Sequence, residues 1–525
     1  MINKLKTIGI LCSVLLLVTV GIQAQVEEKS LELSLEDCIV RALENNLDVR
    51  ADILSPRIAD IAVSRAGEIF LPQMTFGFTK RDTEQASYSF LDAGGSVQSV
   101  QDSYSARITQ LVPTGGTFTF TVDGYKTDSN RSFQTINPRY GATMTFNFSQ
   151  PLLRNFGPKT TRREIIVARN NLDISRKNFE TNMINTIYSV EEAYWNYIYN
   201  IELLKVRQQS LKLAKDLLEK NQRSVEVGTM APIEVLTAES EVATREADIL
   251  QAQAQVRNSE DQLKTLMNLQ AEGREIEALN LVPLDSPVYE KKEITFDEAL
   301  AFAIQKRSDL EATRIDLENR QINLSYAKNQ LLPDLSLNAQ VWSPGISGNQ
   351  ILYLNNNALS GVIVGVIPGG ATDALKDAFG FNYFNFNIGL TLTVPLNSIF
   401  SRANYAQARV NLEQAQIRLE SQEQKAFVEI KTAVRSVETD YLRVQAYKVA
   451  RDLAWRKQEA EEEKLKVGLS TNYLVLLSQR EFRNAQVQEL RSVMDYNLSL
   501  ARLSRSMGLT LDEKNIRISS LIEEK

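Results

Sequence analysis

The sequence predicts a mixed α and β membrane protein in which a membrane β-barrel is continued by a long α-helical coiled-coil barrel. Three observations predict this fold class. An internal repeat covers most of the chain, two very long runs lack both glycine and proline, and short segments alternate apolar with small polar residues. The repeat predicts the organisation of the chain, the long runs predict helices, and the alternation predicts strands.

The internal repeat consists of two blocks, each present twice without a gap. Residues 33–78 align with 294–339, and residues 168–269 align with 408–509. The order of features is also the same in both halves: helix, proline, β-rich stretch, proline, long helix, glycine and shorter helix. Self-similarity over such lengths predicts a tandem duplication.

The repeats define the expected organisation of the chain. We expect a signal peptide over 1–24, a first structural repeat over 25–285 and a second over 286–525. In the first repeat we expect a helix over 35–71, barrel strands over 73–150, a long helix over 159–227 and a helix over 232–270. In the second we expect a helix over 296–332, barrel strands over 334–394, a long helix over 397–467, a helix over 471–507 and a tail over 508–525.

The two long runs without glycine or proline predict coiled-coil helices. At 1.5 Å per residue each could extend roughly 100 Å, and a helix of that length needs a partner along its course. Apolar residues recur every seven positions, a spacing that makes left-handed coiled-coil seams. The first long run carries this repeat at Met183, Val190, Tyr197, Leu204, Leu211, Leu218 and Val225.

Between the prolines the apolar period changes from seven to two. Phe118, Phe120 and Val122 alternate with threonines, and Phe384, Phe386 and Ile388 alternate with asparagines. Strands of this pattern are typical of an outer-membrane barrel. A soluble antiparallel sheet with one buried face would show a similar pattern.

One chain has four clear strands, or six if 103–112 and 117–126 form an added hairpin. Fewer than eight strands do not close a spanning barrel, and open edges are not tolerated in lipid. We therefore expect several chains to share one barrel.

The bulk composition limits the function. Acidic residues number 65 and basic residues 59, and there is no basic stripe, so the sequence predicts no nucleic-acid binding. The absence of histidine removes the commonest general base and every zinc site that needs imidazole. Lys4 and Lys6, the apolar stretch that follows and Ala24 are typical of a secretory signal. After the signal no apolar stretch is long enough for a membrane-spanning helix.

Several short motifs, in duplicated order, resemble those of the TolC family of outer-membrane channels, and the resemblance covers the whole mature chain. Arg307-Ser308-Asp309-Leu310 resembles the family's Arg-Pro-Asp-Leu, with serine in place of proline. Gln150-Pro151-Leu152 and Val394-Pro395-Leu396 resemble its junctions between strand and helix. The tips of its helical hairpins resemble the segments containing Val227, Gly228 and Thr229, and Val467, Gly468, Leu469 and Ser470.

The resemblance implies a homotrimer with a shared barrel in outer-membrane lipid and a large periplasmic portion. It also implies docking of the hairpin tips onto a periplasmic adaptor (membrane fusion protein) and an inner-membrane transporter or secretion ATPase. The chain would then be a passive exit duct of a tripartite efflux or type I secretion system. Such a duct is no enzyme and has neither cofactor nor bound metal.

Four prolines and three gate positions complete the candidate sites. We expect Pro72, Pro151, Pro333 and Pro395 to set the turns between barrel and helices. In the channel that gives the family its name, aspartates after the second tip close the periplasmic mouth, and an arginine at that tip bridges to an acid near the first. Aligned on Gly468, the aspartate positions here hold Leu474 and Leu477, the arginine position holds Ser470, and only the acid near the first tip has a counterpart, Glu234. Leucine rings predict a hydrophobic constriction. Packing of both leucines between helices is the alternative.

Two other classes of protein compete with the channel. An exported coiled-coil structural protein or adhesin of the cell envelope would account for the seven-residue spacing, but for neither the alternating segments nor the duplication. An exported enzyme with catalytic carboxylates would need a pair of acids that no pattern in the sequence groups. The sequence does not specify the cargo.

Overall fold

The computed structural model describes residues 29–87, 95–269, 279–287 and 289–516. The expected signal peptide, 1–24, lies outside the described residues, as does the end of the expected tail. The chain divides into two compact units. Unit 1 comprises the chain up to Leu54, Phe179–Ser308 and the chain from Gln424 onward; unit 2 comprises Ser55–Asn178 and Asp309–Glu423.

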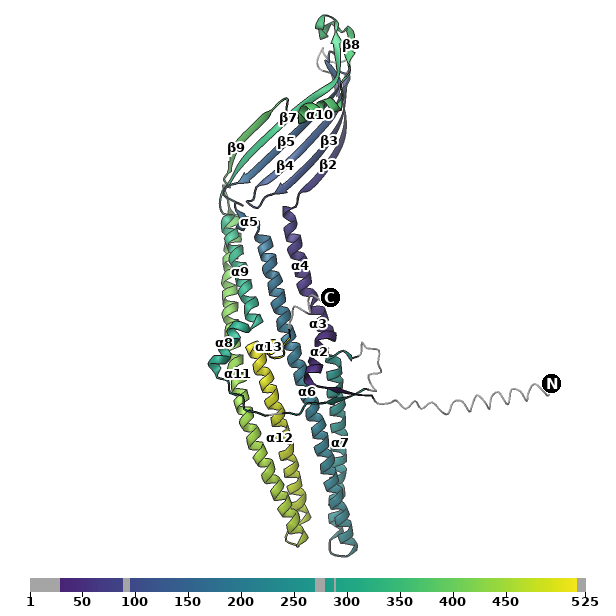
Figure 1. Cartoon of the computed structure of the whole chain (residues 1–525), viewed down its shortest axis with the longest axis vertical. Coiled ribbons are helices and arrows are strands. Elements are labelled where there is room, and N and C mark those ends of the chain that lie inside the picture. The colour runs from purple at the N-terminus through teal and green to yellow at the C-terminus, as the bar shows by residue number, and fades with distance from the viewer. Residues whose placement is uncertain (1–28, 88–94, 270–278, 288, 517–525) are drawn as a thin grey trace, which may run out of the picture. The chain divides into compact units, whose positions relative to one another are not determined.

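Unit 2 contains an antiparallel sheet whose strands come from both repeats (Figure 1). The strands are β2 (Gln73–Ala86), β3 (Ser96–Leu111), β4 (Thr117–Ser129), β5 (Ile136–Pro151), β7 (Asp334–Tyr353), β8 (Ile363–Ile367) and β9 (Asn385–Thr393). They pair in the order β2-β3-β4-β5-β7, and β7 then pairs with β9 along its first half and with β8 at its far end. The hairpin of β3 and β4 therefore joins the sheet, which settles the choice between four and six long strands.

The register gives this sheet two chemically different faces, because residues directly paired across strands share a face. One paired row runs across all six long strands and is entirely apolar: Met74, Ile108, Phe120, Phe146, Val341 and Phe386. The neighbouring row lies on the other face and is mainly polar: Thr75, Arg107, Thr121, Thr145, Trp342 and Asn385. We call these the apolar face and the polar face.

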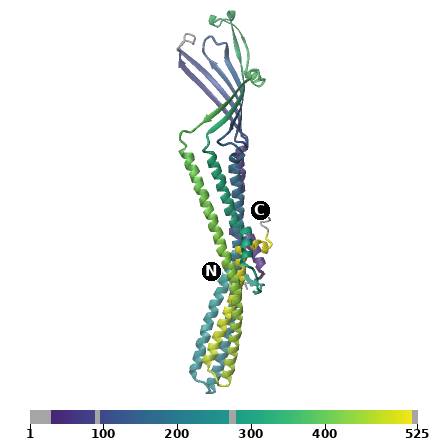
Figure 2. The same ribbon diagram turned by 90° about the vertical axis from the view of Figure 1, so that its left-hand side faces the viewer.

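A short helix, α10 (Ala371–Phe379), interrupts the second β-rich stretch between β8 and β9. Figure 2 shows the sheet of unit 2 with α10 lying against one side of it. Strands alone were expected over 334–394, so this helix is a difference from the sequence prediction. Its turn spacing places Ala374 and Ala378 on one side, where both are buried against Ala142 of β5.

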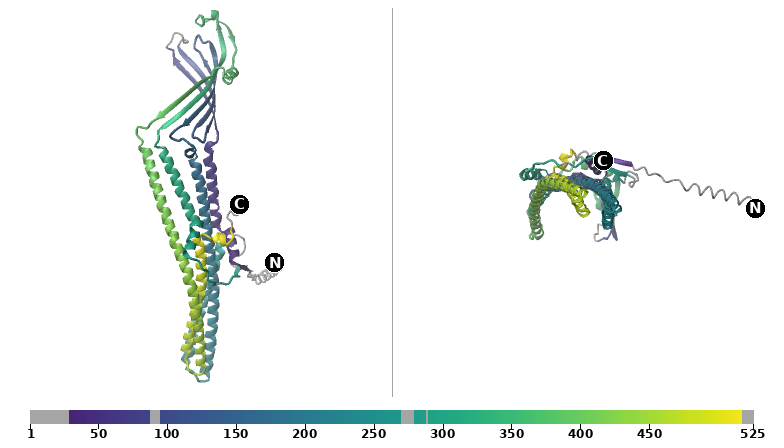
Figure 3. Two further views of the ribbon diagram at one scale, coloured as in Figure 1. Left: turned by 60° about the vertical axis from the view of Figure 1, so that its left-hand side comes forward. Right: turned by 90° about the horizontal axis from the view of Figure 1, so that it is seen from below.

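Unit 1 is built on helices that pack along one another (Figure 3). They are α2 (Leu35–Asn45), α3 (Leu47–Asp52), α7 (Pro232–Leu266), α8 (Phe296–Lys306), α12 (Asn472–Met507) and α13 (Thr510–Glu513). The long helices α6 (Arg163–Glu226) and α11 (Ile399–Lys466) each begin in unit 2 and end in unit 1. The remaining helices are α4 (Leu54–Gly67), α5 (Pro158–Thr161) and α9 (Ser308–Asn329).

The core of unit 1 follows the seven-residue repeat. Met183, Val190 and Tyr197 of α6 are almost completely buried, in one cluster with residues of α2 and α7. A two-stranded parallel sheet of β1 (Lys29–Leu33) and β6 (Leu279–Pro283) lies beside them. The hydroxyl of Tyr197 donates to the carbonyl of Leu281 (2.7 Å), which ties α6 to this sheet.

Two expected helices are interrupted in the structure. Over 35–71 there are three helices and a final turn, and over 296–332 there are two, α8 and α9. Asn46 explains the first break, because its side chain accepts from the amides of Asp48 and Val49 and so begins a new helix. At the second break Arg307 adopts an extended backbone, with ψ of 113°. The apolar period shows neither break, and local capping chemistry accounts for the first.

Candidate docking tips and gate

Both hairpin tips have the same backbone geometry. Gly228 ends α6 with φ of +73°, and Gly468 ends α11 with φ of +75°. In each tip the glycine amide donates to the carbonyl three residues back and the next amide to the carbonyl five back, which is a Schellman cap. A side chain at a positive φ is strained, so glycine is the residue suited to both positions.

The surroundings of the tips are open and apolar. A Cβ atom placed on Gly228 or Gly468 would meet no atom within 4 Å. Val227, Val467 and Leu469 are 73%, 69% and 79% exposed. Thr229 closes the first tip by donating its hydroxyl to the Ser224 carbonyl (2.9 Å). These residues form a small apolar surface that nothing within the described chain covers.

At the second tip Ser470 has a structural partner. Its hydroxyl donates to Glu461 (2.7 Å), which also pairs with Lys464 at 2.7 Å. The hydrogen bonds from Lys464 and Ser470 lower the pKa of the Glu461 carboxyl. Next to it, Asn472 is buried and donates to the Met230 sulfur (3.1 Å), so one polar contact joins the two tips.

The gate candidates differ from their neighbours in burial. Leu474 is 42% exposed and Leu477 is half-buried, whereas Val475 and Leu476 between them are 1% and 7% exposed. The two buried residues pack with Leu217 of α6. Glu234 is half-buried on α7, and its backbone carbonyl accepts from the Asn221 side chain (3.3 Å). Leu474 and Leu477 therefore lie on the side of α12 that turns away from the packing within the chain.

An arginine cluster between the hairpins was missed by the sequence analysis. Arg245 of α7 is 1% exposed and pairs with Glu241 at 2.8 Å, and Arg480 of α12 reaches the same carboxylate at 3.2 Å. Burial lowers the pKa of Arg245. Arg483 of α12 lies 3.7 Å from Asp248, which completes a second bridge from α12 to α7. The spacing of Glu241, Arg245 and Asp248 along one helix face was the available signal.

The junction prolines lie where strands meet helices in unit 2. Pro72 precedes β2, Pro333 precedes β7, Pro151 ends β5 and Pro395 follows β9. Beyond Pro151, the Leu152 amide donates to the Leu335 carbonyl (2.7 Å). This bond ties the junctions of the first and second repeats together.

No cofactor or metal site emerges from these side chains. Within the described ranges, no group of three or more His, Cys, Asp or Glu side chains could hold a metal ion. Over the same residues, no helix is both long and apolar enough to cross a membrane.

The fold defines a class of protein: two repeats that each contribute strands to one sheet with an apolar face and a long helix that packs with a shorter one. Solved outer-membrane channels have a similar fold. The chain is similar to the channel OprN (15% identity, 90% of this chain and 89% of that one, TM-score 0.65). It is also similar to the CmeC channel of Campylobacter jejuni (17% identity, 93% of this chain and 90% of that one, TM-score 0.61). A third similar structure is the open MtrE channel of Neisseria gonorrhoeae (18% identity, 90% of this chain and 88% of that one, TM-score 0.59). No curated protein sequence matches significantly.

The model of the family described as outer membrane efflux protein matches residues 38–269 and 300–509. The chain belongs to this family. It is an outer-membrane efflux channel protein with a large periplasmic helical portion, which confirms the family resemblance and the location. The two matched segments also confirm the tandem duplication. Because the family consists of channels, neither the adhesin nor the carboxylate enzyme accounts for the chain.

Proposed function

We propose that three copies of this chain form one closed barrel and one tunnel, which serves as the outer-membrane exit duct of a tripartite efflux or type I secretion system. The observation that carries the proposal is the pair of open sheet edges, β2 and β9. Among the residues that the structure describes, each of these strands pairs on one side only, β2 with β3 and β9 with β7.

The two edges are suited to each other. Neighbouring strands from β2 to β9 are all antiparallel. Four long strands lie between β2 and β9, so these two strands run in opposite directions. The β9 strand of one copy can therefore pair antiparallel with β2 of the next. Six long strands from each of three copies would give a barrel of about 18 strands, within the range of outer-membrane barrels. The apolar face would meet lipid and the polar face the lumen.

The helices also carry apolar side chains that the chain itself leaves exposed. In unit 2 these are Ile58 and Ile61 of α4, and Val410 and Ile417 of α11. In unit 1, Leu442 and Val449 of α11 continue the seven-residue spacing. Such stripes are coiled-coil seams without a partner. A neighbouring copy would cover them.

The hairpin tips of unit 1 would dock a periplasmic adaptor, which connects the duct to an inner-membrane transporter or secretion ATPase. The apolar tip residues Val227, Val467 and Leu469 support this role, because small exposed apolar patches are typical of contact surfaces. The duct conducts passively, and its partners supply the energy. In this arrangement Leu474 and Leu477 would form the hydrophobic gate.

The test has two arms. In the first, the gene for this chain is deleted from its host; in the second, the wild-type protein is isolated together with its bound partners. We expect the deletion to abolish export of at least one cargo, and we expect an adaptor to co-purify after mild crosslinking. A host whose export is unchanged, together with a protein that crosslinks to no adaptor, would contradict the proposed duct.

A further inference from the structure

Helix α10 lies on the apolar face of the sheet, in very close contact. A Cβ atom on Gly345 of β7 would come within 2.0 Å of the Ala374 carbonyl oxygen. Ala142, Ala374 and Ala378 bury one another, and Ser343 of β7 has no exposed surface. Small residues on both sides allow this approach. The contact is therefore built into the sequences of β5, β7 and α10.

This helix lies at the border of the apolar face. The paired row beneath it contains Phe78, Tyr104 and Ala142, whereas the next row away from the junction prolines contains Lys80, Asp102, Lys126 and Tyr140. Tyrosines followed by charged residues are typical of the boundary between hydrocarbon and headgroups. On α10 itself Asp373 and Lys376 are exposed while the alanines face the sheet. Such a helix suits a membrane interface.

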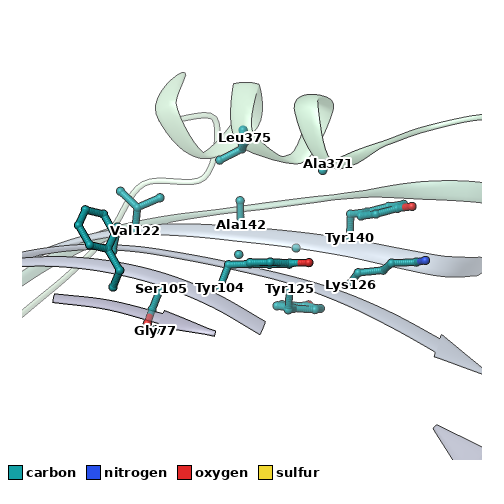
Figure 4. Close-up of a pocket in the computed structure, with 14 residues that line it drawn as sticks. Gly77, Tyr104, Ser105, Val122, Tyr125, Lys126, Tyr140, Ala142, Ala371 and Leu375 are labelled. Atoms are coloured by element: carbon teal, nitrogen blue, oxygen red, sulfur yellow. The ribbon is translucent and has the colours of Figure 1, made fainter. Parts of the chain in front are cut away.

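Beside α10 the apolar face is hollowed into a cavity of about 590 Å³. Phe76 and Ala106 line it from the strands. Tyr104 and Val122 also line it from the strands, and Leu375 lines it from α10 (Figure 4). Lys126 and Tyr140 also line the cavity and bring an ammonium group and a hydroxyl to it. The volume is within the range of small-molecule sites, roughly 300–1,000 Å³.

We propose that this cavity holds one acyl chain of an outer-leaflet lipid, with α10 at the level of the lipid headgroups. The inference rests on the proposed closure of the sheet into a barrel, which turns the apolar face toward lipid. The cavity is continuous with that face, so the molecules that cover the face also reach the cavity. Most of the side chains that line the cavity from the strands and from α10 are apolar, so the site suits an acyl chain.

The test measures lipid retained by the purified assembly. Wild-type protein in mild detergent is incubated with dipalmitoyl phosphatidylglycerol, and native mass spectrometry counts the lipids bound per chain. We expect wild type to retain one tightly bound lipid per chain. Ala106→Trp fills the cavity, and we expect it to reduce retention at least tenfold, with Ala106→Leu between the two.

The matched control is Ala339→Trp. Ala339 is also a half-buried alanine on the apolar face, paired with Phe148 and Ile388, but it does not line the cavity. We expect this variant to retain lipid as wild type does. Equal retention by Ala106→Trp and wild type, or no retained lipid in wild type, would overturn the proposal. A monomeric mass for wild type would contradict the proposed assembly and not the lipid site. Even in that case, lipid loss confined to the Ala106 variants would support lipid binding in the cavity.

Discussion

At the residue scale, the contrast between Leu474 and its neighbours makes the gate hypothesis testable. Val475 and Leu476 hold the helices together, while Leu474 and Leu477 turn away from them. We expect Leu474→Ser with Leu477→Ser to raise open probability in planar bilayers sharply, because a serine ring stays wetted. We also expect little change in thermal stability, since neither side chain is fully buried.

The control for the gate is Leu476→Ala, which truncates a buried neighbour. It should cost about 2–5 kcal/mol of stability and leave conductance unchanged. If the double serine variant instead lost stability and kept its conductance, both leucines would be packing residues.

Cys38 gives a second prediction at this scale. Burial, assisted by the charge of Asp37, raises the pKa of its thiol from the ordinary 9.0 to about 12. The protonated form is thus favoured by folding. This contribution to stability is complete below pH 9.0 and is lost as pH rises toward about 12. Iodoacetamide at mildly alkaline pH should leave the folded protein unmodified and alkylate it fully in denaturant. Rapid alkylation of folded protein would contradict the burial.

At the scale of elements, the tips combine a backbone requirement with the docking role proposed above, and two substitutions separate the two. Gly468→Asn keeps a residue that tolerates the left-handed conformation, so we expect trimers and transport to persist. Gly468→Trp adds a strain of about 1–2 kcal/mol and a bulky side chain in open space. We expect Gly468→Trp, and likewise Gly228→Trp, to abolish transport while trimers still form. Normal transport by Gly468→Trp would remove the docking role.

The arginine cluster supports a prediction about how the hairpins stay together. Glu241→Ala would leave Arg245 buried without its carboxylate and would free Arg480 of α12. We expect a loss of about 3–5 kcal/mol, measured by thermal or denaturant unfolding, because an uncompensated buried charge is costly.

On the same helix, Glu246 pairs with Lys215 at 2.7 Å, and both side chains are about half exposed. Glu246→Ala is therefore the control, with an expected cost of about 1 kcal/mol or less. Equal costs for the two variants would mean that the contacts of Glu241 with Arg245 and with Arg480 stabilise the hairpins no more than the exposed pair does.

At the scale of the whole molecule, the prediction is the mass of the assembly. Protein extracted from outer membranes in mild detergent should have three times the chain mass, because six long strands leave β2 and β9 open in a single copy. A stable, folded monomer would contradict the shared barrel. High-salt washing should leave the protein in the outer-membrane fraction.

Features that depend on periodicity and on single residues with special backbones were predictable before the fold was known. The heptads of α6 and the alternating strands follow from local spacing, since helices repeat near 3.6 residues and strands at two. The duplication follows from comparison of the two halves of the sequence, and the tips follow from single glycines. Leu474 and Leu477 became gate candidates through the family resemblance, by alignment on Gly468.

How distant segments meet became visible in the folded chain alone. The hairpin of β3 and β4 joins the sheet in a register that continues the apolar row. The sequence left this open because the pattern of one strand does not show which strand it pairs with. Helix α10 is too short to show a period, and its place depends on Gly345 and Ala142, which lie far from it in sequence. The cluster around Arg245 likewise needs α7 and α12 side by side. Contacts between remote segments carry no local signal, and for that reason these features appear only in the folded chain.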